Sequence, residues 1–219
     1  MQPHLVLHHF PGACSQVCLV ALEEAGLDHE VHLVDMKSGE QSTSAYGAVS
    51  PLGKVPALTV DGTTILENMA IQTYIAALRP EAGLFPEATS PMDHGRRVSG
   101  LSFCGGTLHP IVRGLFNPAR LSDGDPEGVR SMARSLAAKS FGYAERHLAD
   151  SGWWLGTWSM IDVYLNWAVS IARRSDYDVS PFPLLAGLHE RLMERPAFAR
   201  ALARDAEFSA ELERRHASA

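Results

Sequence analysis

Residues 56–66 read Pro-Ala-Leu-Thr-Val-Asp-Gly-Thr-Thr-Ile-Leu, two short apolar runs separated by Asp61-Gly62. An aspartate-glycine pair tolerates the positive φ angles of a type I′ turn, so this stretch predicts a β-hairpin. Before it, the apolar runs His4–His8 and Val31–Val34 enclose a helical pattern over Ser15–Ala25. A strand, a helix and a second strand at this spacing predict a parallel pair joined by a right-handed crossover.

The stretch after the hairpin, Asn68–Leu78, has helical spacing and a candidate N-cap in its first residue. Residues 1–79 are therefore predicted to form an α/β domain, β-α-β-β-β-α, around a four-stranded mixed sheet. Two prolines and a glycine within residues 79–86 predict a domain linker, which we place at 80–91. Residues 92–219 show about five helical segments and no convincing strand, which predicts an all-α second domain.

Composition narrows the class of protein and its partners. The 219 residues carry a formal net charge of −6 and three cysteines. A negative charge disfavours nucleic acid, because phosphate binding needs a basic face. The N-terminus lacks the features of a signal peptide, and no run approaches the ~18 apolar residues of a membrane span. Three cysteines do not suit a disulfide scaffold. We expect a cytoplasmic protein with reduced thiols and no membrane partner.

Three motifs together resemble a known family. They are Pro11-Gly12-Ala13-Cys14-Ser15, Ser50-Pro51-Leu52-Gly53-Lys54-Val55-Pro56-Ala57-Leu58 and Glu67-Asn68. In this order, ahead of a helical half, they resemble the cytosolic glutathione transferases over essentially the whole chain, and the first motif resembles the bacterial beta class. The resemblance implies a thioredoxin-like domain that binds glutathione and a helical domain that shapes an apolar electrophile pocket. It also implies a homodimer with a role in detoxification.

Cys14 and Ser15 are the candidate catalytic residues. Cys14 follows a strand and lies at or just before a helix N-terminus, where unpaired N–H groups and the helix dipole favour a thiolate. Conjugation needs a hydrogen-bond donor for the glutathione thiolate, and the Ser15 hydroxyl or a backbone N–H can supply it. Cys14 can instead form a mixed disulfide with glutathione. The sequence leaves these alternatives open, whereas Cys18 and Cys104 are predicted to be buried within helices.

Four residues are candidates for binding the peptide part of glutathione. The resemblance implies a cis bond between Val55 and Pro56, which would let the Val55 backbone pair with an extended peptide as strand addition does. Glu67 can pair with an ammonium group. The Asn68 side chain and the N–H groups at its helix start can hold a carboxylate. The γ-glutamyl end of glutathione carries both of these groups.

Lysines and histidines complete the candidate site. Lys54 is a candidate partner for the glycyl carboxylate, and Lys37 is a second one. His8 and His9 are adjacent on a predicted strand and point to opposite faces, so they do not chelate one ion, and no metal is expected. By the resemblance, His9 falls where beta-class relatives carry a tyrosine. We place His9 and His109 at the second-substrate pocket.

The predicted function is that of a glutathione S-transferase. Glutathione is the cosubstrate, and its thiolate attacks a small hydrophobic electrophile that the sequence does not identify. One alternative is a glutathione-dependent thiol transferase, lyase or isomerase that uses Cys14 through a mixed disulfide. The other is a non-catalytic module of the same fold that binds ligands or proteins. The candidate glutathione-binding residues argue against that module, because it need not keep them.

Overall fold

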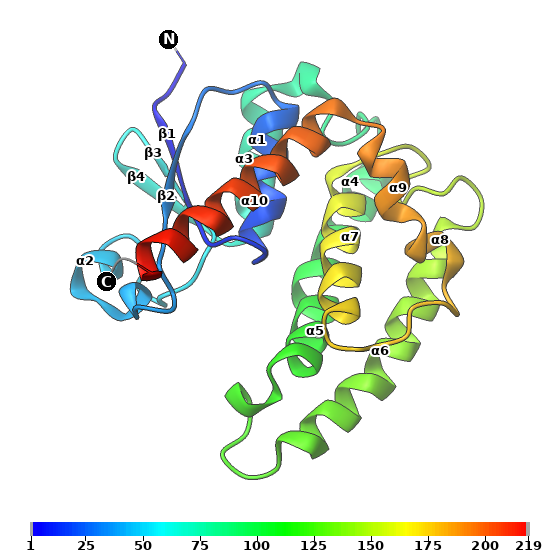
Figure 1. The fold of residues 1–219 in the computed structure, drawn as a ribbon. Helices are drawn as coiled ribbons and strands as arrows, with labels where there is room; N and C mark the ends of the chain where they lie inside the picture. The colour runs from blue at the N-terminus through cyan, green and yellow to red at the C-terminus, as the bar shows by residue number, and fades with distance from the viewer. Residues whose placement is uncertain (1, 218–219) are drawn as a thin grey trace. The chain divides into compact units, whose positions relative to one another are not determined.

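The computed structural model describes residues 2–217, which divide into two compact units. The first unit comprises Met1–Leu84 and Met193–Ala219, and the second comprises Phe85–Leu192 (Figure 1). The predicted boundary assigned all of 92–219 to one helical domain. The structure differs, because the last helix of the chain packs along the first helix and so belongs to the first unit.

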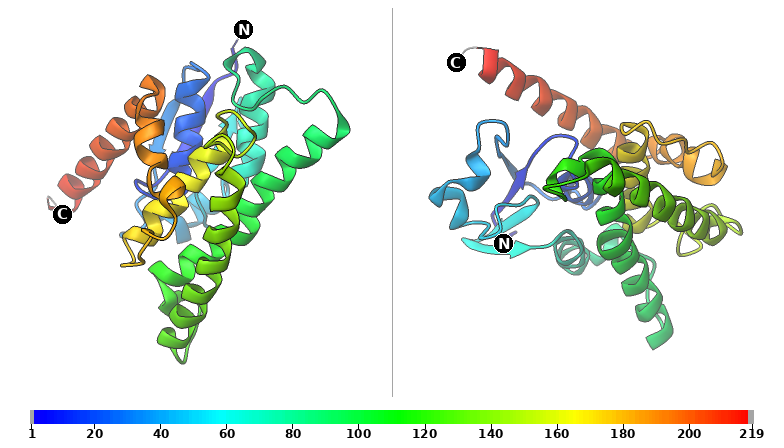
Figure 2. Two further views of the ribbon diagram at one scale, coloured as in Figure 1. Left: turned by 90° about the vertical axis from the view of Figure 1, so that its right-hand side faces the viewer. Right: turned by 90° about the horizontal axis from the view of Figure 1, so that it is seen from below.

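The first unit is built on a four-stranded mixed sheet, as predicted. Its strands lie in the order β2-β1-β3-β4, with β1 parallel to β2 and antiparallel to β3. Its elements are β1 (Leu5–His9), α1 (Ser15–Glu24), β2 (Glu30–Leu33), η1 (Glu40–Ser42), α2 (Ser44–Gly47), β3 (Ala57–Val60), β4 (Thr63–Leu66), α3 (Asn68–Leu78), η2 (Pro80–Ala82) and α10 (Pro196–Ala217). The α1 and α10 helices lie side by side in Figures 1 and 2.

The hairpin between β3 and β4 has the predicted turn. Asp61 and Gly62 have φ angles of 46° and 84°, the two positive values that a type I′ turn requires. This turn fixes the register, which pairs Val60 with Thr63 and Ala57 with Leu66. The second of these pairs brings the end of β4, and hence the start of α3, beside the start of β3.

The second unit is all helical. The 92–217 part of the chain holds seven α-helices rather than about five, because a π-helical turn separates two of them and two short helices follow α7. The elements of this unit are α4 (Pro91–Ser102), the π-helical turn η3 (Phe103–Leu108), α5 (His109–Phe116), η4 (Pro118–Arg120), α6 (Pro126–Leu148), α7 (Met160–Arg173), α8 (Pro183–Ala186) and α9 (Leu188–Met193). Pro110 lies in the first turn of α5, where its missing N–H is tolerated.

Helix α7 is the core of the second unit. Twelve of its fourteen residues are buried. It begins with a capping box in which the Asp162 carboxylate accepts hydrogen bonds from the Ser159 amide and hydroxyl, at 2.8 and 3.0 Å. The same carboxylate accepts the Trp154 amide at 2.8 Å. No helix within residues 2–217 combines the length and apolarity needed to cross a membrane.

Candidate active site

Cys14 lies at the N-cap of α1, immediately after a tight turn. The turn has Gly12 at a φ of 72°, a value that suits glycine, and the Ala13 amide donates to the Phe10 carbonyl at 3.1 Å. The Cys14 side chain is 9% exposed, and its thiol lies 3.5 Å from the Val55 carbonyl oxygen, to which it donates. The sulfur therefore lies where the N-terminus of a ten-residue helix meets the segment before β3.

Ser15 is positioned differently from the sequence prediction. Its side chain is fully buried, and its hydroxyl donates to the Phe10 carbonyl and accepts from the Phe10 amide, both at 3.2 Å. These two bonds use the hydroxyl to close the turn between β1 and α1. Ser15 thus has a structural role in this turn, and its role as the hydrogen-bond donor to a bound thiolate stays a prediction.

The Val55–Pro56 bond is cis, as the resemblance implied. The loop before it is held by Lys54, whose carbonyl accepts from the Tyr46 and Ser50 hydroxyls at 2.9 Å each. Burial raises the pKa of Tyr46 to about 12, so this donor stays protonated. Within residues 2–217 the Val55 amide has no hydrogen-bond partner. It is a backbone donor that an extended peptide can use.

Asn68 is the first residue of α3, and its side chain faces inward. Its amide donates to the Cys14 carbonyl at 2.6 Å, and its side-chain oxygen accepts from Gln72 at 2.6 Å. The Cys18 thiol also points at that oxygen, at 3.6 Å. The Asn68 side chain is 6% exposed, and its binding of a ligand carboxylate stays a prediction. In this structure the side chain ties the start of α3 to the start of α1.

Glu67 takes the capping position that the sequence assigned to Asn68. It has a φ of 69° and an exposed side chain, and it directly precedes the first N–H groups of the eleven-residue α3. Those N–H groups suit the carboxylate of an amino acid, and the Glu67 carboxylate suits its ammonium group.

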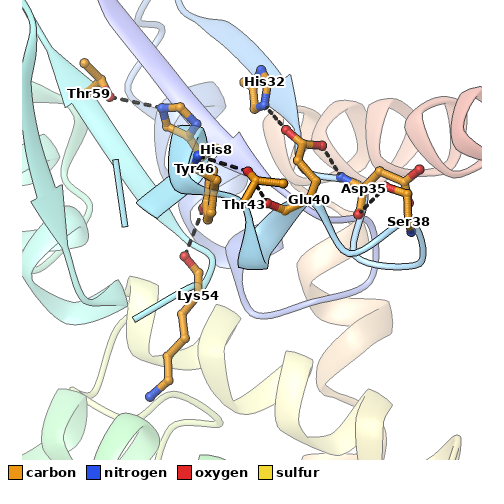
Figure 3. A network of polar contacts seen from close by, with 9 residues as sticks. All are labelled: His8, His32, Asp35, Ser38, Glu40, Thr43, Tyr46, Lys54 and Thr59. Carbon is orange, nitrogen blue, oxygen red and sulfur yellow. Dashed lines mark hydrogen bonds and ion pairs between the residues drawn. The ribbon is translucent and has the colours of Figure 1, made fainter. Parts of the chain in front are cut away.

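The two candidate lysines are exposed. Lys54 extends its side chain away from the loop that its backbone anchors (Figure 3). Lys37 lies in the turn after β2, where its amide donates to the Asp35 carboxylate at 3.0 Å. Neither side chain makes an ion pair with any described residue, so both are available to an anionic ligand.

The two adjacent histidines point to opposite faces of the sheet, as predicted. His8 is buried against Tyr46 and His32, and its Nε2 lies 3.0 Å from the Thr59 hydroxyl (Figure 3). Burial, reinforced by the nearby His32, lowers the pKa of His8 to about 4. His8 is therefore a neutral side chain at physiological pH.

His9 lies on the α10 side of the sheet. It is fully buried, with its ring edge-on to Phe208 and its Nε2 2.9 Å from the Asp205 carboxylate. In the described residues this side chain packs against α10, and its place at a second-substrate pocket stays a prediction.

His109 belongs to a cluster of aromatic side chains in the second unit. Its Nδ1 lies 2.8 Å from the Tyr164 hydroxyl, and its ring centroid is 4.6 Å from that of Trp167. His109 itself is partly exposed, whereas Tyr164 and Trp167 are buried. His109 is therefore the member of these three that reaches the surface, and the two buried rings hold it in place.

Asp205 is the residue near Cys14 that the sequence prediction missed. It lies in α10, yet its carboxylate accepts from the Gly12 amide and the Gln16 side chain. A signal was present, because Asp205 occupies a position on the apolar face of α10, which also carries Phe198, Ala201 and Leu212. A buried carboxylate on such a face needs partners, but the sequence alone does not say which ones.

The other two cysteines are structural. Burial raises the pKa of both the Cys18 and the Cys104 thiol well above the ordinary value, which leaves them protonated and unreactive. Among residues 2–217, no three or more His, Cys, Asp or Glu side chains come together in an arrangement that could hold a metal ion.

Known proteins are similar to this chain in sequence and in fold. Residues 3–77 match the family model described as the glutathione S-transferase N-terminal domain. Over 193 residues, 87% of this chain and 93% of the relative, the sequence is 30% identical to the glutathione S-transferase GstA of Escherichia coli O157:H7. The chain belongs to the glutathione S-transferase family. The fold class and enzyme class expected from the sequence are thereby confirmed.

Other known proteins are also similar. The chain is 27% identical to the mouse maleylacetoacetate isomerase over 89% of each protein. Among solved structures, a sphingomonad glutathione S-transferase complexed with glutathione aligns with a TM-score of 0.80 and 33% identity, covering 92% of this chain and 98% of that one. A bacterial beta-class enzyme from Sphingomonas chungbukensis aligns with a TM-score of 0.81 and 31% identity, over 91% and 98%.

Proposed function

We propose that this transferase binds glutathione and directs its thiolate at a small apolar electrophile. The observation that carries the proposal is the convergence of the Cys14 sulfur with the Val55 backbone, 3.5 Å apart. An extended peptide paired with Val55 brings its own cysteine side chain to the N-terminus of α1. The helix dipole at that point stabilises a thiolate, and keeping the glutathione sulfur ionised at neutral pH and positioned for attack is how such a site accelerates the reaction.

The two ends of glutathione find matching groups in the first unit. The start of α3 offers N–H groups to the γ-glutamyl carboxylate, and Glu67 offers an anion to the adjacent ammonium. Lys54 and Lys37 are exposed cations for the glycyl carboxylate. The sphingomonad relative complexed with glutathione supports glutathione as the thiol.

The electrophile pocket is proposed to use the His109 cluster. Tyr164 and Trp167 are buried and hold the ring of His109, which is partly exposed and supplies a polar edge. Such an edge can bind the polar group of an electrophile. We further propose a cytoplasmic homodimer. The absence of a disulfide from all three cysteines suits a reducing compartment.

A second candidate function is thiol exchange through Cys14. Its position at a helix N-terminus favours the thiolate that such chemistry needs, and the similarity to a mouse protein named maleylacetoacetate isomerase supports a reaction other than conjugation. In this reaction the Cys14 thiolate attacks the glutathione sulfur of a mixed disulfide between glutathione and a substrate thiol, forms its own mixed disulfide with glutathione and releases the substrate as a thiolate. A glutathione thiolate then attacks the glutathione sulfur bound to Cys14, forms glutathione disulfide and regenerates the Cys14 thiolate.

Substitution of Cys14 separates the two functions. Cys14→Ala is expected to keep conjugation of glutathione to a chromogenic aryl halide if the helix end activates glutathione itself, and to lose it if Cys14 is the covalent partner. Intact-mass measurement after treatment with glutathione disulfide adds a direct test, because thiol exchange requires one added glutathione mass on the wild type and none on Cys14→Ala. Failure to detect glutathione binding by calorimetry would overturn both enzymatic functions and favour a non-catalytic module.

A further inference from the structure

The buried carboxylate of Asp205 connects the end of the chain to the reactive turn. Asp205 is 8% exposed and lies on the face of α10 that packs against α1. One of its oxygens accepts from the Gly12 amide at 3.1 Å and from the Gln16 side chain at 3.0 Å. The other accepts from the same amide at 3.3 Å and lies 2.9 Å from His9 Nε2.

These partners bracket Cys14 on both sides. His9 ends β1, Gly12 lies two residues before Cys14, and Gln16 lies two residues after it. A buried carboxylate is tolerated only when donors surround it, and here every donor belongs to the segment that carries the sulfur. The stabilisation gained by Asp205 therefore depends on one conformation of that segment.

From this arrangement we infer that Asp205 is a positioning residue for Cys14 and for the N-terminus of α1. The inference rests on the proposed function in taking the Cys14 turn as the reactive centre. Without the carboxylate, the Gly12 amide and the Gln16 side chain each lose a hydrogen bond, and His9 loses the oxygen beside its Nε2. The turn is then less restrained relative to the Val55 backbone. Misplacement of the sulfur by even 1 Å can reduce the rate of a reaction by up to ~100-fold.

Arg204 provides a matched control on the same helix. Its guanidinium contacts Glu23 and lies 2.9 Å from His29, so it also ties α10 to α1, but at the opposite end of α1 from Cys14. Arg204→Ala removes a polar contact between the two helices and leaves the contacts of the Cys14 turn intact. Comparison with this variant separates a general loss of α10 packing from a specific effect on the Cys14 turn.

The first test compares the kinetics of Asp205→Ala and Arg204→Ala, measured well below their melting temperatures. We expect Asp205→Ala to lower kcat about tenfold with little change in the KM for glutathione, because Asp205 does not touch Val55, Glu67 or Lys54. Asp205→Asn keeps one carbonyl oxygen for the Gly12 amide and is expected to recover part of kcat. An Asp205→Ala enzyme that melts earlier but keeps the kcat of Arg204→Ala would show a purely structural role and overturn the inference.

The second test does not depend on transferase activity. Alkylation of Cys14 by iodoacetamide is followed at high pH, where the thiol is ionised and the rate reports access to the sulfur. We expect a several-fold faster rate in Asp205→Ala and an unchanged rate in Arg204→Ala. Equal rates in the wild type and Asp205→Ala would overturn the inference even if conjugation had never been detected. If Asp205→Ala does not fold, the kinetics and the alkylation rate are measured on Asp205→Asn and Gln16→Ala instead.

Discussion

His8 illustrates how one buried side chain can give a protein a pH dependence. Its ring packs against those of Tyr46 and His32. A charge on His32 would repel a charged His8, and the Glu40 carboxylate, 2.7 Å from His32, partly offsets that repulsion (Figure 3). Desolvation dominates and lowers the pKa of His8 from 6.5 to about 4. An unfolded chain therefore binds a proton at this residue before the folded protein does, so acid favours unfolding.

His8→Asn is expected to remove this share of the acid sensitivity. The stabilising contribution of the neutral His8 is complete above pH 6.5 and is lost as the pH falls towards 4. Over that window the wild type should lose up to about 2 kcal/mol more free energy of unfolding than His8→Asn. Denaturant titrations at a series of pH values measure the difference. His4→Asn, at an exposed histidine, is the control and should follow the wild type; an identical course for His8→Asn would contradict the prediction.

Ser15→Ala should separate stability from catalysis. The change deletes the hydroxyl that satisfies both the N–H and the C=O of Phe10 in a buried turn. We expect the free energy of unfolding to fall by about 1–3 kcal/mol, while kcat for conjugation at low temperature stays near the wild-type value. A thermal melt and a steady-state assay on one preparation check both parts. A drop in kcat comparable to that of a lost nucleophile would restore Ser15 as a catalytic residue.

At the scale of elements, local signals in the sequence were enough to place the strands and helices of the first unit. Asp61-Gly62 set the hairpin, and the start of α1 at Ser15 and the bounds of α3 agree with the prediction. The directions of the side chains were not predictable in the same way. Ser15 and Asn68 were assigned to ligands because each stands at a helix start, but packing turned both inward.

Those side-chain directions depend on partners that are far away in sequence. Asn68 bonds to the Cys14 carbonyl across 54 residues, and Asp205 bonds to Gly12 across 193. No local pattern specifies such a pair, because the pairing exists only once two elements have docked. An unusual residue type on an apolar face, as at Asp205, is the most that the sequence offers.

The capping box of α7 is a prediction at this scale. Asp162→Ala leaves three buried donors, two from Ser159 and one from Trp154, without an acceptor. We expect a loss of about 2–4 kcal/mol in the free energy of unfolding near pH 5. Burial raises the pKa of Asp162 to about 6, so its contribution is greatest below pH 4 and is lost as the pH rises through 6. In denaturant titrations, the difference in free energy of unfolding between the wild type and Asp162→Ala should therefore become smaller from pH 4 to pH 7. A difference that becomes larger would contradict the raised pKa of Asp162.

At the scale of the whole molecule, the chain does not divide where its composition changes. The proline-rich stretch near residue 80 marks the end of the first unit's sheet and helices, and the first unit indeed ends at Leu84 on that side. By contrast, no change in sequence composition indicates that residues 193–219 belong to the first unit. Helix α10 is amphipathic, and an apolar face of that kind could equally have packed on the helices of the second unit. The charges that pair across the α1–α10 contact, such as Arg204 with Glu23, distinguish the two possibilities.

The proposed homodimer leads to a prediction about assembly. In the second unit, α6 exposes Met132, Leu136 and Tyr143, which share one face because they are spaced by four and seven residues. Large apolar side chains gathered on one helix face are typical of an interaction surface. We expect the wild type to elute with the mass of two chains in size-exclusion chromatography with light scattering. The double substitution Met132→Glu, Leu136→Glu should give a folded monomer, because the charges cannot be buried without partners.

Leu121→Glu is the matched control for this surface. Leu121 is 52% exposed in the same unit but lies outside α6, so its substitution adds a charge at an equally apolar position without touching the α6 face. It should remain dimeric, with the melting temperature of the wild type. Dissociation in both variants would point to a general effect of added charge. A wild type that is monomeric at micromolar concentration would remove the homodimer from the proposal while leaving the site in the first unit unaffected, since Cys14, Val55 and the start of α3 all belong to one chain.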